Sequence, residues 1–295
     1  MHLLAYLLIY PIIWLISMLP FRIFYFFSDL IFILVYYIIG YRKTIVTENL
    51  KLAFPDKTEK EIKTIRRKFY SHMCDLFLEM TKTMSISEKE MLKRFKYTNP
   101  EFIQDLETRK SVAVMTSHYA SWEWTVILQH HVQSQCFAIY KRIRNPYFDK
   151  LAQDVRAKYN SKLVTSKESI PLILGNKRNN VASIYGFASD QSPKLNKAFH
   201  WQDFMGHSIP VFTGAEMLAK KCDLAVCYLS TVKVKRGHYE ATFIPITENP
   251  KDFENYQITD IFLELVEKQI RESPEFYLWT HKRWKHRGKN PNQSK

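Results

Sequence analysis

The first forty residues constrain the fold of this chain most, because they are long apolar runs with almost no charge. The run from Leu3 to Leu19 is nearly all apolar, and the run from Phe21 to Ile39 carries only Arg22 and Asp29 as charged side chains. As helices these runs would measure roughly 25–29 Å, against a hydrocarbon core of about 30 Å. They predict a membrane anchor, formed either by one tilted span with an interfacial helix or by a hairpin dipping into one leaflet.

The anchor is expected to stay on the mature protein. A cleaved signal peptide has a basic start, a short apolar stretch and a small-residue cleavage site. Here the chain begins Met-His-Leu-Leu, and no Ala-x-Ala-like site follows the apolar runs. Arg42 and Lys43 come directly after the second run. Positive charge at that position favours a body that faces the cytoplasm.

The excess of positive charge lies in the body of the protein. The formal net charge is +14, and the two charges of the first forty residues cancel. A basic body suits anionic lipid, nucleic acid, an acidic carrier protein or a phosphorylated substrate. No nucleic-acid reading module is recognisable, and the aromatic residues lie in apolar runs rather than on a basic stacking face. We therefore expect a membrane surface and no nucleic acid as a partner.

The cysteines and paired histidines do not indicate a disulfide framework or a metal centre. The four cysteines, at positions 74, 136, 222 and 227, are too sparse for the framework of a small secreted domain. Cys222 and Cys227 have no second pair to complete a metal site, so buried free thiols are expected. His130 and His131 are interpreted as a helix end, and no metal is predicted.

Beyond the anchor, the pattern of apolar residues alternates between helix and strand. Residues 44–84 are predicted to be helical with a break at Pro55, and Thr58 with Glu61 resembles a capping box at the next helix start. The stretch 200–207 is expected to be a loop. The alternation predicts a single α/β domain with a mixed, largely parallel sheet flanked by helices. Strands are expected at 111–117, 136–140, 162–165, 181–188, 224–234 and 239–246, and helices at 146–159, 170–176, 213–221 and 258–270.

A histidine and a carboxylate follow the first predicted buried strand. His118 comes directly after strand 111–117, and Glu123 lies five positions later. Five residues of continuous helix rotate by about 500°, so the two side chains meet only if His118 lies in the turn and Glu123 in the first helical turn. This places both at the carboxyl end of a strand, where open α/β sheets bind their ligands.

Such a pair suits the activation of a hydroxyl. A neutral imidazole takes the proton of the attacking hydroxyl, and a carboxylate on the other ring nitrogen fixes the tautomer. If that hydroxyl attacks a carbonyl, the carbonyl oxygen becomes an oxyanion, which helix-start N–H groups or a nearby cation could stabilise. From the spacing alone, His118 could equally cap a helix while Glu123 lies on the surface.

Several ordered motifs resemble one family. The segment HYASWE at 118–123 resembles the H-x-x-x-x-D/E motif of glycerolipid-type acyltransferases. Within that group, the order of blocks resembles the lipid A biosynthesis late acyltransferases, the lauroyl and myristoyl transferases. The resemblance covers roughly residues 40–288. The further matching blocks are NL followed by AFP at 49–55, IYKRIRNPYFD at 139–149, SDQSP at 189–193, FMG with VFTGAEMLA at 204–219, and YLWTHKRWKHR at 277–287.

The resemblance implies an enzyme that needs no cofactor. It would move a fatty acyl chain from acyl carrier protein or acyl-CoA to a hydroxyl of a lipid acceptor, foremost a lipid A precursor. His118 would be the general base and Glu123 would orient it. The expected location of the protein is the bacterial inner membrane, with the catalytic domain facing the cytoplasm. The implied division is an anchor at 1–40, an acyltransferase domain at 41–288 and a frayed basic tail at 289–295.

Five further residues are candidates for substrate binding or support. Asp190 matches a family position tied to activity. Lys141 stands where the family has an arginine, so it keeps the charge and loses the planar fork, and the adjacent Arg142 or Arg144 could take over. Arg283 would bind phosphate or the carrier, or else belong to a solvated basic tail.

The sequence leaves the acceptor and the acyl chain length open. An enzyme of the same fold could act on an aminolipid, a lysophospholipid or another glycolipid. A non-catalytic lipid-binding membrane protein is the alternative from a different class.

Overall fold

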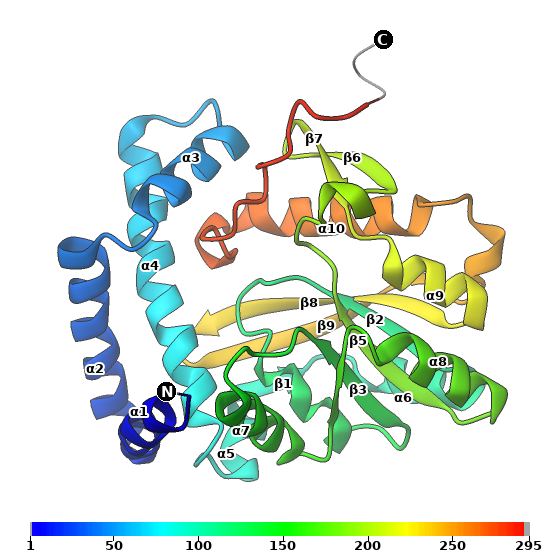
Figure 1. Ribbon diagram of the computed structural model, residues 1–295, viewed down its shortest axis with the longest axis horizontal. Helices are drawn as coiled ribbons and strands as arrows, with labels where there is room; N and C mark the ends of the chain where they lie inside the picture. Colours follow the sequence, from blue (N-terminus) through cyan, green and yellow to red (C-terminus); the bar gives the residue numbers. More distant parts are fainter. Residues whose placement is uncertain (1, 292–295) are drawn as a thin grey trace.

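The computed structural model describes residues 2–291, and its N-terminal part is helical. Helix α4 (Glu59–Lys82) lies at the centre of this part, with α1 (His2–Met18) and α2 (Phe21–Ile33) packed against it. Helix α2 continues directly into a short π-helical segment, η1 (Leu34–Ile39), and α3 (Lys43–Ala53) leads to α4. Figure 1 shows α1 and α2 together at one edge of the molecule, beside α4.

The predicted break and capping box are both confirmed. Helix α3 ends before Phe54, and α4 begins after Thr58. The Thr58 side chain accepts a hydrogen bond from the backbone N–H of Glu61, while the Glu61 carboxylate accepts from the backbone N–H of Thr58. Each group satisfies an N–H that would otherwise lack a partner at a helix start.

A seven-stranded sheet forms the core of the body. Its order is β1-β9-β8-β2-β5-β3-β4, with all neighbouring pairs parallel except the antiparallel pair β8–β9. The predicted mixed, largely parallel sheet is therefore confirmed. The strands are β1 (Phe95–Tyr97), β2 (Val112–Thr116), β3 (Gln135–Tyr140), β4 (Lys162–Thr165), β5 (Ser183–Ala188), β8 (Ala225–Lys235) and β9 (His238–Thr247).

Helices cover this sheet, as the apolar strands require. Figure 1 shows α10 on one side of the sheet, with α5 and α7 on the other. For this reason, strands β2 and β5 and the first half of β8 are nearly continuous runs of buried residues. The covering helices are α5 (Glu88–Arg94), α6 (Pro100–Arg109), α7 (Pro146–Ala157), α8 (Ser169–Arg178), α9 (Gly214–Cys222) and α10 (Gln257–Glu272).

The structure differs from the sequence predictions in three short regions. The stretch expected to be a loop around His200 and His207 forms an antiparallel hairpin of β6 (His200–Phe204) and β7 (His207–Val211). The turn of this hairpin places Met205 and Gly206 at positive φ, so a two-residue turn replaces a loop. Strand β1 has three residues and was not predicted. The helix expected to include Glu123 begins only at Trp124 and is a 3-10 helix, η2 (Trp124–His130).

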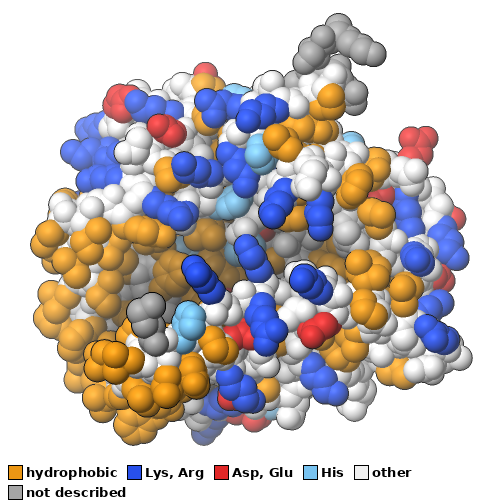
Figure 2. Space-filling model, viewed as in Figure 1, with side chains coloured by type: hydrophobic (Ala, Val, Ile, Leu, Met, Phe, Trp, Pro, Cys, Tyr) orange, Lys and Arg blue, Asp and Glu red, His pale blue; other side chains and the backbone are white. Residues whose placement is uncertain are grey.

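The N-terminal helices expose an unusually large apolar surface. The run Phe21–Ile39 is long and apolar enough to cross a bilayer, while His2–Met18 is apolar but shorter. Most large apolar side chains of these helices are 40% or more exposed, among them Leu8, Leu15, Phe26 and Ile38. Figure 2 shows them as a continuous orange surface over α1 and α2, bordered by lysine and arginine side chains. We call this surface the apolar belt.

Two further predictions concern the cysteines and the C-terminus. All four cysteines are free and buried, as expected. Of the segment 289–295, expected to be frayed, residues 292–295 lie outside the described residues. Asn290 is buried and donates a hydrogen bond to the hydroxyl of Ser208.

Candidate active site

The pairing of two neighbouring strands brings the first two site residues together. Strands β2 and β5 are parallel, and their register ends with Thr116 opposite Ala188. His118 and Asp190 each lie two residues beyond these partners. Because carboxyl ends of parallel strands meet at one edge of the sheet, both side chains reach the same place.

There His118 and Asp190 form a charge-assisted hydrogen bond. The Nδ1 of His118 lies 2.7 Å from Oδ1 of Asp190. The Asp190 side chain is almost fully buried, whereas about one fifth of the His118 side chain is exposed. Since Nδ1 is engaged by the carboxylate, Nε2 is the ring nitrogen left to accept a proton.

The electrostatics of the pair match this geometry. Burial alone would lower the pKa of His118, but the Asp190 charge and hydrogen bond, with a smaller effect of the Glu123 charge, raise the pKa above its usual value. Burial alone would raise the pKa of Asp190, but the His118 interaction, with help from Arg283, holds that pKa below its usual value. Asp190 is therefore a carboxylate, and it strengthens the imidazole as a base.

A buried set of C-terminal side chains surrounds Asp190. Tyr277 and Arg283 both interact with this carboxylate, and both are almost completely buried. The Arg283 Nη1 donates hydrogen bonds of 3.1 Å to the Ser192 hydroxyl and to the backbone oxygen of Pro210. Burial and the neighbouring Arg283 lower the pKa of His281 to about 4, so His281 is neutral near pH 7.

The C-terminal segment also fixes the backbone around His118. The N–H of Leu278 donates to the carbonyl of His118, and the N–H of Ala120 donates to the carbonyl of Phe276. Ala120 has φ 49°, a conformation that costs free energy in a residue with a Cβ atom. The two hydrogen bonds hold the chain in this conformation directly after His118.

Glu123 is placed differently from the prediction. Its carboxylate accepts three hydrogen bonds of 2.6–2.8 Å from Nε and Nη2 of Arg156 on α7. The carboxylate bonded to His118 is Asp190, so the expected contact between Glu123 and the imidazole is not formed. The physical reason is that residues 119–123 form an isolated β-bridge and bends rather than a first helical turn, which directs Glu123 toward α7. Its charge still acts on His118.

Arg156 was missed by the sequence reasoning. It lies seven residues after Asp149 on α7, and seven residues return to nearly the same face of a helix. The hydrogen bonds from Tyr140 and Ile143 to Asp149 show that this face points inward. The helix was predicted, but the sequence carried no signal for which arginine on it meets Glu123.

The three predicted cations lie on the surface. Lys141, Arg142 and Arg144 are exposed in the segment between β3 and α7. Arg142 lies 3.5 Å from the Asp149 carboxylate. Within residues 2–291 none of the three contacts His118 or Asp190. Arg156, which is largely buried, is instead the cation that pairs with Glu123.

Arg283 is likewise placed differently from both expectations. Its side chain is fully buried, so it neither belongs to a solvated basic tail nor faces a phosphate or a carrier protein. Its charge serves the buried Asp190 instead, because a buried carboxylate needs a compensating partner. Among residues 2–291 no group of three or more histidine, cysteine or acidic side chains could hold a metal ion.

The site therefore contains the His118 imidazole, polarised by Asp190, and the ion pair of Glu123 with Arg156. An imidazole held at Nδ1 by a buried carboxylate can accept a proton at Nε2 and return it in the same turnover. This arrangement is suited to activating a hydroxyl for acyl transfer.

Comparison with known proteins agrees with this class. The chain matches, over residues 2–286, a family described as bacterial lipid A biosynthesis acyltransferase. It belongs to this family and is an acyltransferase. It is also similar to the lipid A biosynthesis lauroyltransferase of Escherichia coli K12, with 23% identity over 279 residues, which cover 94% of this chain and 90% of that protein.

Proposed function

We propose that this protein transfers a fatty acyl chain from an acyl thioester to a hydroxyl of a lipid A precursor at the bacterial inner membrane. The donor would be acyl carrier protein or acyl-CoA, and the catalytic domain would face the cytoplasm. The observation that carries the chemistry is the 2.7 Å contact of His118 Nδ1 with the buried Asp190.

In this mechanism, Nε2 of His118 removes the proton of the acceptor hydroxyl as its oxygen attacks the thioester carbonyl. A new C–O bond forms, and the carbonyl oxygen becomes an oxyanion. When the intermediate collapses, the C–S bond breaks, and the imidazolium returns the proton to the departing sulfur. Asp190 stabilises the imidazolium and keeps the reactive tautomer.

Arg156 is the proposed source of positive charge for the oxyanion. Its bidentate pairing with Glu123 fixes the plane of the guanidinium. A preorganised cation stabilises developing negative charge without reorganising during the reaction. Glu123 therefore acts as a positioning residue for Arg156 rather than for His118.

The test is acyl transfer by a His118→Ala variant, with labelled acyl carrier protein or acyl-CoA as donor and a lipid A precursor as acceptor. Turnover is expected to fall by about 10²–10⁴-fold. His200→Ala is a matched control, since His200 also pairs with a carboxylate, Asp260, at 2.8 Å but lies on β6. Wild-type turnover by the His118 variant would remove this residue from the mechanism. Lipid mass spectrometry with and without the gene identifies the species that loses one acyl chain.

The apolar belt is proposed to lie in the plane of the membrane. Helix α2 is fastened to α4 and to the turn between β8 and β9 by polar contacts along its length. Ser28 donates to Asp75 at 2.8 Å, and Tyr25 donates to Glu79 at 2.7 Å. Asp29 pairs with Arg236 at 2.6 Å. If α2 crossed the bilayer in this arrangement, these charged groups of the body would enter the hydrocarbon, at a cost of several kcal/mol each.

A helix α2 that lies in the plane of the membrane gives a suitable environment to both its polar and its apolar face. Its polar contacts stay with the body while the apolar belt enters one leaflet, as in monotopic proteins. Cysteine substitutions at Pro20 and Tyr41 test this, because the four native cysteines are buried. An impermeant thiol reagent applied from the periplasmic side should label neither position. Labelling of Pro20→Cys alone from that side would instead establish a spanning α2.

A further inference from the structure

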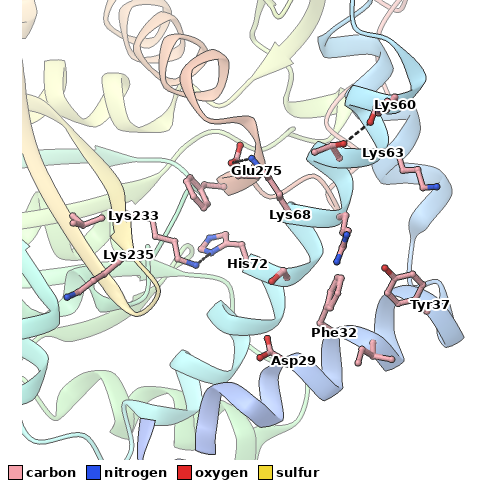
Figure 3. Close-up of a pocket in the computed structure, with 16 residues that line it drawn as sticks. Asp29, Phe32, Tyr37, Lys60, Lys63, Lys68, His72, Lys233, Lys235 and Glu275 are labelled. Atoms are coloured by element: carbon pink, nitrogen blue, oxygen red, sulfur yellow. Dashed lines mark hydrogen bonds and ion pairs between the residues drawn. The ribbon is translucent and has the colours of Figure 1, made fainter. Parts of the chain in front are cut away.

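A second hollow in the molecule uses none of the residues assigned to acyl transfer. It is a groove of about 1060 Å³ between α2–η1, α4, the end of β8 and the segment around Glu275. Figure 3 shows that its labelled side chains come from α2–η1 on one side, α4 in the middle and β8 on the other side. We call it the basic groove, because six cations line it: Lys60, Lys63, Arg67, Lys68, Lys233 and Lys235.

The acidic side chains of the basic groove are already neutralised. Glu275 pairs with Lys68 at 3.4 Å, and Asp29 pairs with Arg236 at 2.6 Å. Lys233 lies deeper, 3.3 Å from His72 and 3.4 Å from the buried Asp75.

Four cations of the groove remain uncompensated. Lys60, Lys63, Arg67 and Lys235 are exposed and form no ion pair within residues 2–291. Positions 60, 63 and 67 recur at helical spacing, so they project from one side of α4. Like charges held this close repel one another unless an anion lies between them.

The remaining wall of the basic groove is apolar and belongs to the membrane-facing helix. Phe32, Ile33 and Tyr37 line it. Ile33 and Tyr37 are 48% and 57% exposed, and they continue along the helix surface into the apolar belt. The cations of the basic groove therefore border the apolar belt. If α2 lies in a leaflet, this border would lie at the level of the lipid headgroups.

We propose that the basic groove binds the phosphate-bearing headgroup of an anionic membrane lipid. The phosphate would lie beside Lys63 and Arg67, which are about one helical turn apart on α4, and the acyl chains would follow the side of α2 into the leaflet. Arginine and lysine are the side chains that suit phosphate oxygens. The proposal rests on the membrane association proposed above, but it does not depend on acyl transfer.

The apolar wall favours a lipid over an acidic protein as the occupant. An acidic carrier protein would match the cations but leave the apolar wall without a partner. A lipid matches both parts of the groove. Its charged headgroup would contact the cations, and its apolar chains would contact the wall formed by α2.

The test compares binding of the full-length protein to vesicles of neutral phosphatidylcholine and to vesicles that also contain phosphatidylglycerol. The variant is Lys63→Glu with Arg67→Glu. Its matched control is Lys251→Glu with Lys268→Glu, which changes the net charge equally at exposed positions outside the groove. Each basic residue near an anionic surface contributes about fivefold to binding, so the groove variant, which loses two cations and gains two carboxylates, should lose at least about 25-fold in affinity for anionic vesicles. The control should lose much less, and binding of all three proteins to neutral vesicles should be equal.

Three outcomes would overturn the proposal. Equal losses in both double variants would indicate attraction by overall charge. Equal binding of short-chain soluble glycerophosphate and of anionic vesicles would indicate a phosphate site that does not need a lipid. Unchanged vesicle binding with weakened binding of acyl carrier protein would assign the groove to the carrier. The vesicle assay needs no acyl donor. A negative result in it would therefore not bear on acyl transfer, which the His118→Ala variant tests separately.

Discussion

The replacement of Asp190 by asparagine tests the catalytic geometry most directly. The carboxylate is 1% exposed and lies 2.7 Å from His118 Nδ1. Asparagine keeps the volume and removes the charge. Its amide can also donate a hydrogen bond to Nδ1, which would place the ring proton on Nε2 and abolish its function as a base.

The size of the effect follows from the burial of the pair. No water can replace a carboxylate at a position this buried, so the imidazolium loses most of its stabilisation. We expect turnover to fall by about 10³-fold, which corresponds to about 4 kcal/mol in the transition state. Removing the charge also removes the influence that raises the pKa of His118. The rate of the wild type should rise with pH as His118 loses its proton, and the midpoint of residual activity in Asp190→Asn should move to lower pH.

The assay is acyl transfer measured from pH 5 to 9, together with circular dichroism to establish folding. Asp260→Asn is the matched control, because it neutralises the carboxylate of the second His–Asp pair, with His200. The reasoning would be refuted if folded Asp190→Asn retained turnover within about threefold of the wild type, or if its pH midpoint did not move.

Two other predictions concern residues outside the His118–Asp190 pair. Arg156→Gln removes the bidentate partner of Glu123 and should lower turnover by about 10²-fold. Arg156→Lys should restore part of the rate, because it keeps the charge but not the planar fork. Equal turnover of the wild type and both variants would exclude a role for this cation. Gly237→Ala should destabilise the fold by about 2–4 kcal/mol in thermal unfolding, because its φ is +70° and its Cβ would collide with the Tyr25 hydroxyl. Gly206→Ala is its control, with φ +78° and open space, and an equal loss there would attribute the whole effect to the backbone.

Much of the fold was predictable because its strands are buried runs between clear breaks. The expected strand 162–165 coincides with β4, and 136–140 differs from β3 by one residue. Strand β1 was missed because three residues are too few to show a period. The β6–β7 hairpin was missed because its polar and aromatic residues resemble a loop.

The candidate site was predictable in its position but not in its pairing. His118 and Asp190 both follow buried strands, which places them at the carboxyl edge of the sheet. That these two strands are neighbours depends on the strand order, which the local pattern does not contain. The expected partnership of His118 with Glu123 assumed a turn at His118 and a helix that already includes Glu123. The positive φ of Ala120 and the following bends replace that helix.

The backbone hydrogen bonds that join Leu278 and Phe276 to His118 and Ala120 have a consequence for biosynthesis. A ribosome makes the apolar helices α1 and α2 more than 200 residues before the residues that fasten the histidine. A nascent chain can therefore reach the lipid bilayer well before it has a functional catalytic centre. Premature termination upstream of position 276 should yield polypeptides that still associate with membranes and have no transferase activity.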